Sequence, residues 1–110
     1  MINVNQKISI SLAEIECNTF KALVKHGADD WVAREVSKAV RLAEASGNLI
    51  CGLYYLESYC NQLSSGRVKG NVEPKIIETK PGAVLVDAKF GFAQAAFHRG
   101  LPYALKKVKK

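Results

Sequence analysis

Cysteine, proline and long apolar runs are all scarce in this sequence of 110 residues. Its three cysteines include no C-x-x-C pair, so neither a disulfide framework nor a zinc site with the usual ligand spacing is indicated. No apolar run approaches the roughly 18 residues that cross a bilayer, and the N-terminal MINVNQKISISL lacks the apolar region of a signal peptide. We therefore expect a cytoplasmic protein with free thiols, without a metal and without membrane association.

Acidic residues are fewer than basic ones, 10 against 16, which gives a net charge of +6. Four of the lysines lie in the final KKVKK, and the rest of the chain is close to neutral. Aromatic residues are not interleaved with these lysines, so no platform for stacking nucleic-acid bases is visible. Because lysines at the end of a helix interact favourably with its dipole, the tail needs no nucleic acid as a partner, and none is expected.

The hydrophobic pattern predicts a single α/β unit over residues 1–110, with three helices, then two strands and a last helix. Ser11 and Glu14 form a capping-box pattern, in which the Ser11 hydroxyl bonds the N–H of Glu14 and the Glu14 carboxylate reaches back to the N–H of Ser11. The helices are expected at about 11–26, 30–46, 52–64 and 91–109, and the strands at about 75–79 and 83–88.

Local signals add detail to this order. Asp29 or Asp30 is expected to cap the second helix, and KISI at residues 7–10 suggests a short edge strand. Pro102 predicts a kink in the last helix or its division into two shorter helices. Cys17 and Cys60 fall within apolar helical patterns, where a thiol usually serves as a small hydrophobic side chain.

The end of the chain leaves hydrophobic residues without an obvious cover. Two strands by themselves form a marginal sheet, and in α/β proteins a helix that follows a strand usually leads to another strand. The sequence therefore resembles part of a larger fold, and we expect the uncovered residues to make an interface in a dimer or larger species. These residues of the last helix are Phe97, Leu101, Leu105 and Val108.

Three groups of segments carry a resemblance to a known family: SLAEIE, KALVKHGA and AVRLAEASG, then GLYYLESYCNQLSSGRVKG, then VDAKFGFAQAA and GLPYALKK. In this order they resemble the N-terminal portion of the malate/L-lactate dehydrogenase-like oxidoreductases, which include sulfolactate and ureidoglycolate dehydrogenases. The resemblance implies a larger non-Rossmann dehydrogenase fold, a dimer, and NAD(P)-dependent interconversion of 2-oxo acids or cyclic imino acids with their reduced forms. Because family members are several times longer, it also implies a truncated or degenerate member.

The resemblance further implies which residues occupy the catalytic positions. The family motif Gly-x-x-Ser-His-Gly, aligned on Gly47 and Gly52, places Ile50 at the Ser and Cys51 at the His that acts as acid and base. Tyr55 takes the position of a frequent Arg that pairs with the substrate carboxylate. Imidazole exchanges protons near neutral pH, whereas free thiols titrate higher, and a phenol cannot make the bidentate charged contact of an Arg. Three polar functions are replaced together, which predicts an inactive site.

Two alternatives to simple inactivity are open at this point. Cys51 could act as a nucleophile, because it precedes the third helix and a helix N-terminus favours a thiolate; against this, neither His26 nor His98 is placed in sequence to activate it. Alternatively, the chain is a non-catalytic interaction protein that pairs with itself or with a full-length paralogue. NAD or NADP is expected to bind weakly or not at all, because the resemblance implies that most of the family's cofactor-binding surface lies beyond residue 110. The glycine pattern in VDAKFGFAQ indicates packing rather than nucleotide binding.

Overall fold

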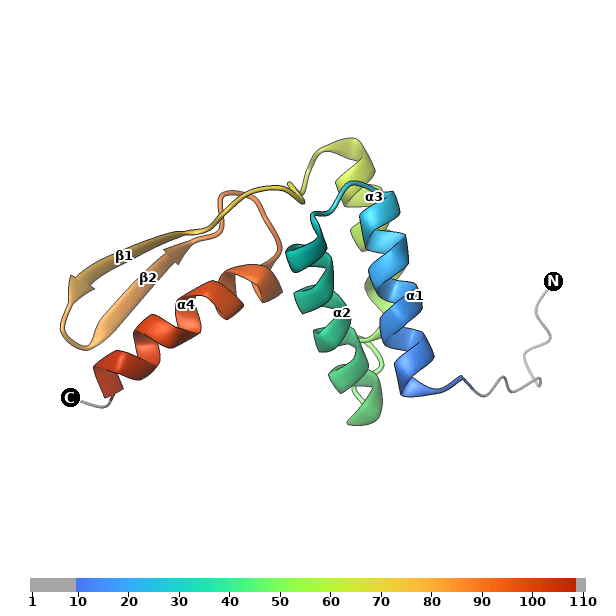
Figure 1. Ribbon diagram of the computed structural model, residues 1–110, viewed down its shortest axis with the longest axis horizontal. Coiled ribbons are helices and arrows are strands. Elements are labelled where there is room, and N and C mark those ends of the chain that lie inside the picture. The colour runs from blue at the N-terminus through green and yellow to red at the C-terminus, as the bar shows by residue number, and fades with distance from the viewer. Residues whose placement is uncertain (1–9, 109–110) are drawn as a thin grey trace.

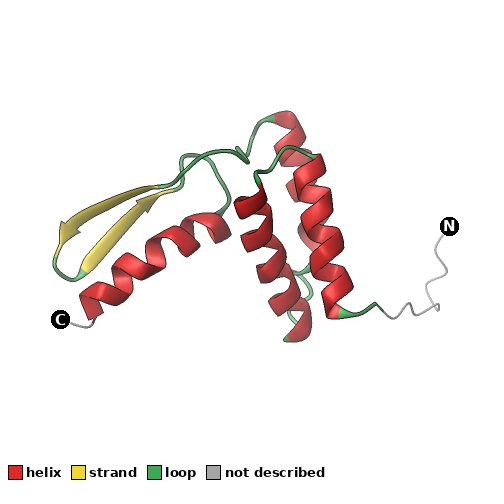
Figure 2. Cartoon of the chain, viewed as in Figure 1, coloured by secondary structure: helices red, strands yellow, loops and turns green. Residues whose placement is uncertain are grey.

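A computed structural model describes residues 10–108. It consists of a helical unit, residues 12–65, and an arm, residues 75–108, that extends from it (Figure 1). The radius of gyration of 16.0 Å exceeds the roughly 13 Å of a compact domain of this length, so the molecule is elongated. The elements in chain order are α1 Leu12–Lys25, α2 Asp30–Ala45, the 3₁₀ turn η1 Leu53–Tyr55, α3 Leu56–Ser65, β1 Lys75–Lys80, β2 Ala83–Asp87 and α4 Ala93–Val108. The predicted α/β class and the order of helices and strands are confirmed (Figure 2).

The first helix begins at the predicted cap. The Ser11 Oγ accepts a hydrogen bond from the N–H of Glu14 at 3.1 Å, which is the first half of the capping box. The Glu14 carboxylate accepts the hydroxyl of Ser11 at 3.3 Å, rather than the backbone N–H that the full pattern would use. The carboxylate still lies in the first turn, where a negative charge interacts favourably with the helix dipole.

Replacing Ser11 by Ala should lower the free energy of unfolding by about 1 kcal/mol, because the N–H of Glu14 loses its acceptor. Urea denaturation followed by circular dichroism measures this change. The Ser11→Asp variant retains an acceptor oxygen at the cap and should unfold at the wild-type urea concentration. If both variants lowered the free energy of unfolding equally, the loss in Ser11→Ala would not come from the cap hydrogen bond.

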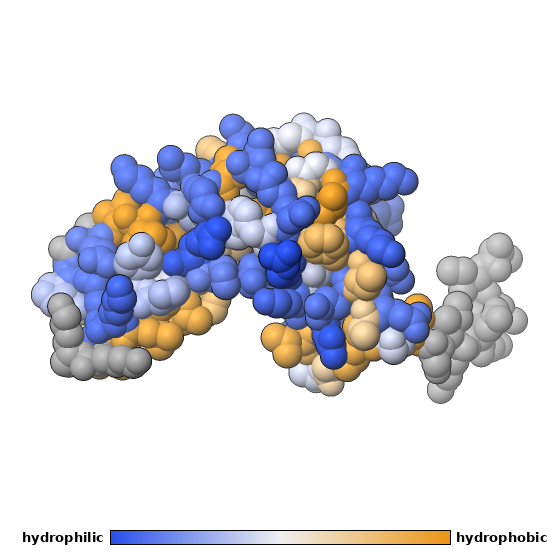
Figure 3. All heavy atoms as spheres, viewed as in Figure 1, coloured by the Kyte–Doolittle hydropathy of each residue, from blue (hydrophilic) through white to orange (hydrophobic). Residues whose placement is uncertain are grey.

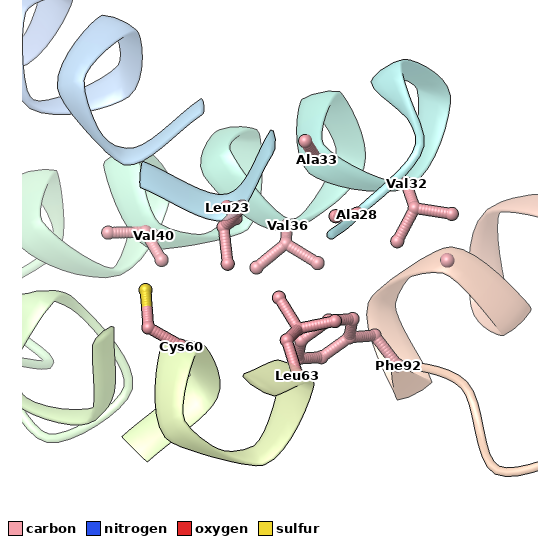
Figure 4. Packing of buried hydrophobic residues seen from close by; sticks show 10 residues of the cluster. Leu23, Ala28, Val32, Ala33, Val36, Val40, Cys60, Leu63 and Phe92 are labelled. Carbon is pink, nitrogen blue, oxygen red and sulfur yellow. The ribbon is translucent and has the colours of Figure 1, made fainter. Parts of the chain in front are cut away.

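The hydrophobic core lies where the three helices of the helical unit meet. Leu23 of α1 and Val36 and Val40 of α2 are all 0% exposed. Figure 4 shows them facing the side chains that α3 contributes, of which Leu63 is the larger, with Phe92 joining from the residues ahead of α4. The core therefore ties all four helices together at one place, although α4 enters it only with its first turn.

The two cysteines predicted to serve as small hydrophobic side chains, Cys17 and Cys60, have different surroundings. Cys60 is buried in the core, which confirms its role as a small hydrophobic side chain, and burial raises the pKa of its thiol. Cys17 is exposed, so the same prediction for it is wrong. The buried positions of α1 are Thr19 and Leu23, and a residue two positions before Thr19 lies on another face of a helix with 3.6 residues per turn.

Polar contacts from the first half of α4 hold the arm beside the helical unit. The Arg99 guanidinium lies 3.9 Å from the centroid of the Trp31 ring of α2, and it also donates to both carboxylate oxygens of Glu73, each at 3.1 Å. The His98 Nδ1 lies 3.1 Å from a carboxylate oxygen of Glu35 on α2. These contacts attach the arm through the first half of α4.

The remainder of the arm is a β-hairpin with α4 packed along it. β1 and β2 are antiparallel, with Ile76 opposite Val86 and an irregularity in the register between Ile77 and Lys80. α4 packs against β2, and at its far end the Lys107 Nζ donates to the carbonyl of Lys80 at 2.7 Å. The C-terminal end of α4 therefore lies beside the hairpin turn.

Several local predictions require correction. α4 is continuous from Ala93 to Val108, so the predicted alternative of two shorter helices divided at Pro102 is wrong. Pro102 is exposed, which lets water replace the N–H that the carbonyl four residues earlier loses. Asp29, one of the two residues expected there, is the N-cap residue of α2, but its side chain makes no capping hydrogen bond. Residues 7–9 of the predicted edge strand lie outside the described residues, and Ile10 is not in a strand.

Candidate functional site

The predicted catalytic positions lie in an irregular segment between α2 and α3. Leu53–Tyr55 form the 3₁₀ turn η1, and α3 begins only at Leu56, so the prediction of a helix from residue 52 is wrong at its start. Cys51 precedes η1 and is separated from the N-terminus of α3 by this turn. Cys51 therefore does not stand directly before the N-terminus of α3, as the nucleophile alternative assumed.

Glu44, at the end of α2, holds this segment in place. Its Oε1 accepts the N–H of Leu53 at 2.7 Å, and its side chain covers the buried Gly52, where an added Cβ would lie 2.7 Å from the Glu44 Cδ. The N–H of Cys51 donates to the Asn48 Oδ1 at 3.5 Å. Sequence reasoning missed Glu44, because its partner is a backbone group nine residues away that belongs to no recognisable cap pattern.

Cys51 has an exposed side chain, and its neighbour Ile50 is 61% exposed. The two imidazoles that could act as a base are engaged elsewhere. The His26 Nδ1 lies 2.7 Å from the carbonyl of Ala22, and His98 pairs with Glu35. Among the hydrogen bonds of residues 10–108, none joins the Cys51 thiol to an imidazole. The structure therefore gives no support to an activated Cys51 nucleophile.

Tyr55 belongs to a row of aromatic rings that leads into the core. Its ring centroid lies 5.2 Å from that of Tyr54 in an edge arrangement and 6.4 Å from that of Tyr59 in a stacked one. Tyr59 in turn meets the edge of Phe92 at 5.4 Å. Tyr55 itself is 43% exposed, so part of it faces solvent while the row of rings restricts its orientation.

An open concavity of about 960 Å³ runs along α3, and Tyr55 lines it together with Arg67. Cys51 is not among its lining residues. The structure thus places the two predicted residues on one segment but does not bring them into one cavity. Arg67, which follows α3 in the loop SSGRVKG, was not identified as a site residue from the sequence, because it belongs to no motif that was recognised; it lies at the opposite end of α3 from Tyr55.

The glycine turn between β2 and α4 packs against the protein itself. An added Cβ on Gly91 would lie 3.0 Å from the carbonyl of Ala88 and 3.1 Å from the Val72 side chain, so the absence of a side chain allows this close packing. Lys89 and Phe90 have positive φ angles of 52° and 65°. The N–H of Lys89 donates to the Asp87 carboxylate at 2.9 Å, and an acceptor at this place would repel a phosphate. Gly91 is a packing glycine, as the sequence indicated.

Two classes of site receive no support from residues 10–108. In this part of the chain no three His, Cys, Asp or Glu side chains gather as they would around a metal ion. Its helices are also too short or too polar to cross a membrane. What remains is the exposed segment around Cys51 and the concavity that Tyr55 and Arg67 line.

Residues 10–110 match the sequence family described as malate/L-lactate dehydrogenase. Delta(1)-pyrroline-2-carboxylate reductase of Pseudomonas fluorescens is 27% identical over 106 residues, which are 96% of this chain and 32% of that protein. (2R)-3-Sulfolactate dehydrogenase (NADP(+)) of Chromohalobacter salexigens is 33% identical over 96 residues, 87% of this chain and 28% of that protein. The chain spans about a third of the length of these relatives.

Solved structures with the same fold extend the comparison. Delta1-piperideine-2-carboxylate reductase from Pseudomonas syringae matches with a TM-score of 0.86 and 25% identity, over 94% of this chain and 31% of that one. Malate dehydrogenase from Entamoeba histolytica matches with a TM-score of 0.85 and 24% identity, over 94% of this chain and 29% of that one. Both matches include the helical unit and the arm as parts of a much longer chain.

Proposed function

Since this chain belongs to the malate/L-lactate dehydrogenase family, we propose that it forms the N-terminal portion of an NAD(P)-dependent oxidoreductase fold and is not a competent catalyst alone. The observation that carries this proposal is the exposed Cys51 at the position where the family resemblance implies an acid/base His. The substrate class is a small 2-oxo acid or a cyclic imino acid, because one relative is named for a cyclic imino acid and another for a 2-hydroxy acid, the reduced form of a 2-oxo acid. NAD or NADP binding by the isolated chain should be weak or absent.

Reduction of such a substrate needs a hydride, which the nicotinamide supplies when bound, and a proton at the carbonyl oxygen or imine nitrogen. The imidazolium–imidazole pair of a histidine suits the proton transfer because it titrates near neutral pH. In this chain the position holds a thiol, which has a shorter reach and ordinarily titrates higher. The substrate carboxylate would meet the phenol of Tyr55, with Arg67 as the cation that lines the same concavity.

The purified chain should therefore show no oxidation of NADH or NADPH with 2-oxo acids or cyclic imino acids, as followed by nicotinamide absorbance. General acid catalysis alone is typically worth about 10²–10⁴ in rate, so its loss suppresses turnover even where substrate binds. The Cys51→His variant restores the imidazole but should also remain inactive alone, because the chain spans about a third of its relatives.

The control for this assay is the other exposed cysteine. Cys17 lies on α1, so Cys17→Ala should behave as the unmodified chain does in every assay. Turnover by the unmodified chain that Cys51→Ala abolishes and Cys17→Ala preserves would contradict the proposal and identify Cys51 as the working acid.

A second candidate function is association, with a further copy or with a full-length member of the family. The specific observation in its favour is the exposure of α4, where Phe97 is 67% and Val108 80% exposed. Sedimentation velocity should therefore detect a dimer or larger species of the purified chain. A single monomeric boundary at high protein concentration would count against this candidate.

The cytoplasm is the compartment that this proposal assigns. All three cysteines are free, and two of them, Cys17 and Cys51, are exposed. Exposed thiols persist in a reducing compartment, where glutathione and thioredoxin keep them reduced.

A further inference from the structure

The segment between α2 and α3 is not held in place by burial of its side chains. Leu49 and Ile50 are each 61% exposed, and Cys51 is exposed as well. The segment lies where α2 ends (Figure 1), and Figure 3 shows hydrophobic residues at the surface of that end of the helical unit. Hydrogen bonds of the backbone, rather than packing of side chains, therefore fix the path of this segment.

The backbone N–H groups of residues 51–53 all have acceptors at the end of α2 or in the turn after it. Cys51 donates to the Asn48 Oδ1 at 3.5 Å, Gly52 to the carbonyl of Leu49 at 3.2 Å, and Leu53 to the Glu44 Oε1 at 2.7 Å. The last of these bonds is the shortest, and its acceptor alone is charged. Because a charged acceptor makes a hydrogen bond about twice as strong as a neutral one, Glu44 is the main anchor of the segment.

The position of Glu44 is unfavourable for α2 itself. It lies in the last turn of the helix, a turn that contains no basic residue, and a negative charge at this end of a helix interacts unfavourably with the helix dipole. Its carboxylate instead accepts the N–H of Leu53, nine residues later in the chain. The stability of α2 therefore does not explain this carboxylate, whereas the anchoring of the segment does.

Gly52 is the second part of this anchor. It is buried, and an added Cβ would lie 2.7 Å from the Glu44 Cδ and 2.8 Å from its Cγ. Because a glutamate side chain has many rotamers, a side chain at position 52 would push the carboxylate aside rather than move the backbone. The N–H of Leu53 would then lose its acceptor, so the anchor bond needs a glycine at position 52.

We propose that Glu44, together with Gly52, is a positioning residue for the side chain of residue 51, and this inference rests on the proposed function, which assigns that position to proton transfer. The three bonded N–H groups fix the peptide planes on both sides of Cys51 and the plane that follows Gly52. Fixed peptide planes set the direction of the Cα–Cβ bond between them. An acid or base must lie within hydrogen-bond reach of the atom that it serves, so the anchor holds residue 51 in place although a thiol stands there.

The test follows the side chain at position 51 directly. A methanethiosulfonate nitroxide is attached to Cys51 of the full chain in the Cys17→Ala background, where Cys60 is the other cysteine and is buried. Its electron paramagnetic resonance spectrum measures how tightly position 51 is held, and amide hydrogen exchange of Leu53 measures the anchor bond. Glu44→Ala should increase the mobility of the label and accelerate this exchange about tenfold, as expected for the loss of one hydrogen bond to a charged group.

Two further variants separate the hydrogen bond from other effects of the substitution. Glu44→Gln keeps an oxygen that accepts the N–H, so it should leave the label as immobile as before and accelerate the exchange by no more than about threefold. Gly52→Ala leaves Glu44 in the chain but displaces its carboxylate, so it should reproduce Glu44→Ala, and the two together should add nothing. The matched control is Glu57→Ala, which removes an exposed carboxylate from α3 and should change neither reading.

Any other pattern overturns the proposal. Unchanged label mobility in Glu44→Ala would show that residue 51 is placed without this side chain, and equal effects of Glu44→Gln and Glu44→Ala would exclude the hydrogen bond as the cause. Additive effects of Glu44→Ala and Gly52→Ala would show that the two residues do not act on one bond. Faster exchange throughout the core, Leu23 included, would assign Glu44 a general role in stability instead.

None of these readings depends on turnover. Catalysis by the isolated chain would therefore contradict only the proposed function, and a mobile residue 51 in the unsubstituted anchor would contradict only the positioning role of Glu44.

Discussion

Replacing Leu23 by Ala should lower the free energy of unfolding by about 2–5 kcal/mol, the range for buried leucines in well-packed cores. Leu23 is 0% exposed and belongs to the cluster that joins α1, α2 and α3. Its carbonyl also accepts the N–H of Ala28 at 3.0 Å, which fixes the backbone and limits how far the helices can close on the cavity. Such a loss is a large part of the roughly 5–15 kcal/mol that stabilises a typical domain.

The matched control is Leu42→Ala on α2, where the side chain is 70% exposed. This substitution removes the same atoms from a surface position and should change stability by less than about 0.5 kcal/mol. Urea unfolding of both variants, monitored by helical circular dichroism, gives the comparison. A loss below about 1 kcal/mol for Leu23→Ala would mean that the cavity closes freely, contrary to the close packing of this cluster.

The features of the fold that follow from local physics could be predicted from the sequence. The Ser11 cap depends on two residues three positions apart, and the buried face of α2 depends on the spacing of Val32, Val36 and Val40. Both patterns lie within one or two turns of a helix, so no knowledge of the rest of the molecule is needed to see them.

The predictions that were wrong concern features that depend on contacts between distant residues or on the solvent exposure of a side chain. The turn η1 replaces the first turn of the predicted helix because Glu44, nine residues earlier, accepts the N–H of Leu53. Pro102 leaves α4 continuous because its position is exposed. Cys17 is exposed and Cys60 is buried, although both lie in helices with apolar neighbours. Sequence periodicity identifies a helix but gives the position of its buried face only approximately.

The candidate site shows the same division. The family resemblance places Cys51 and Tyr55 at functional positions, but it does not show which side chains share a cavity. Tyr55 and Arg67 line one concavity because α3 lies between them in the fold. The other lining residues also lie on or beside α3, so the shared face is a local feature of one helix, but the family motif does not extend to Arg67.

Replacing Gly100 by Ala should destabilise the arm by about 1–3 kcal/mol, the usual cost of overpacking. In the interior of a helix this substitution would normally stabilise by about 1 kcal/mol. Here the added Cβ would lie 2.5 Å from the Val86 Cγ2, because α4 rests on β2 at this glycine. Valine is restricted at χ1, so Val86 cannot move its methyl group away without strain, and α4 must shift from the hairpin.

A double-mutant cycle separates this clash from other effects of the substitution. In the Val86→Ala background the methyl group that meets the new Cβ is absent, so Gly100→Ala should change sign and stabilise by about 1 kcal/mol through helix propensity. Unfolding free energies give the cycle, and amide exchange in α4 and β2 shows whether the change is confined to the arm. Equal losses in the two backgrounds would mean that the contact between Gly100 and Val86 does not fix the distance between α4 and the hairpin.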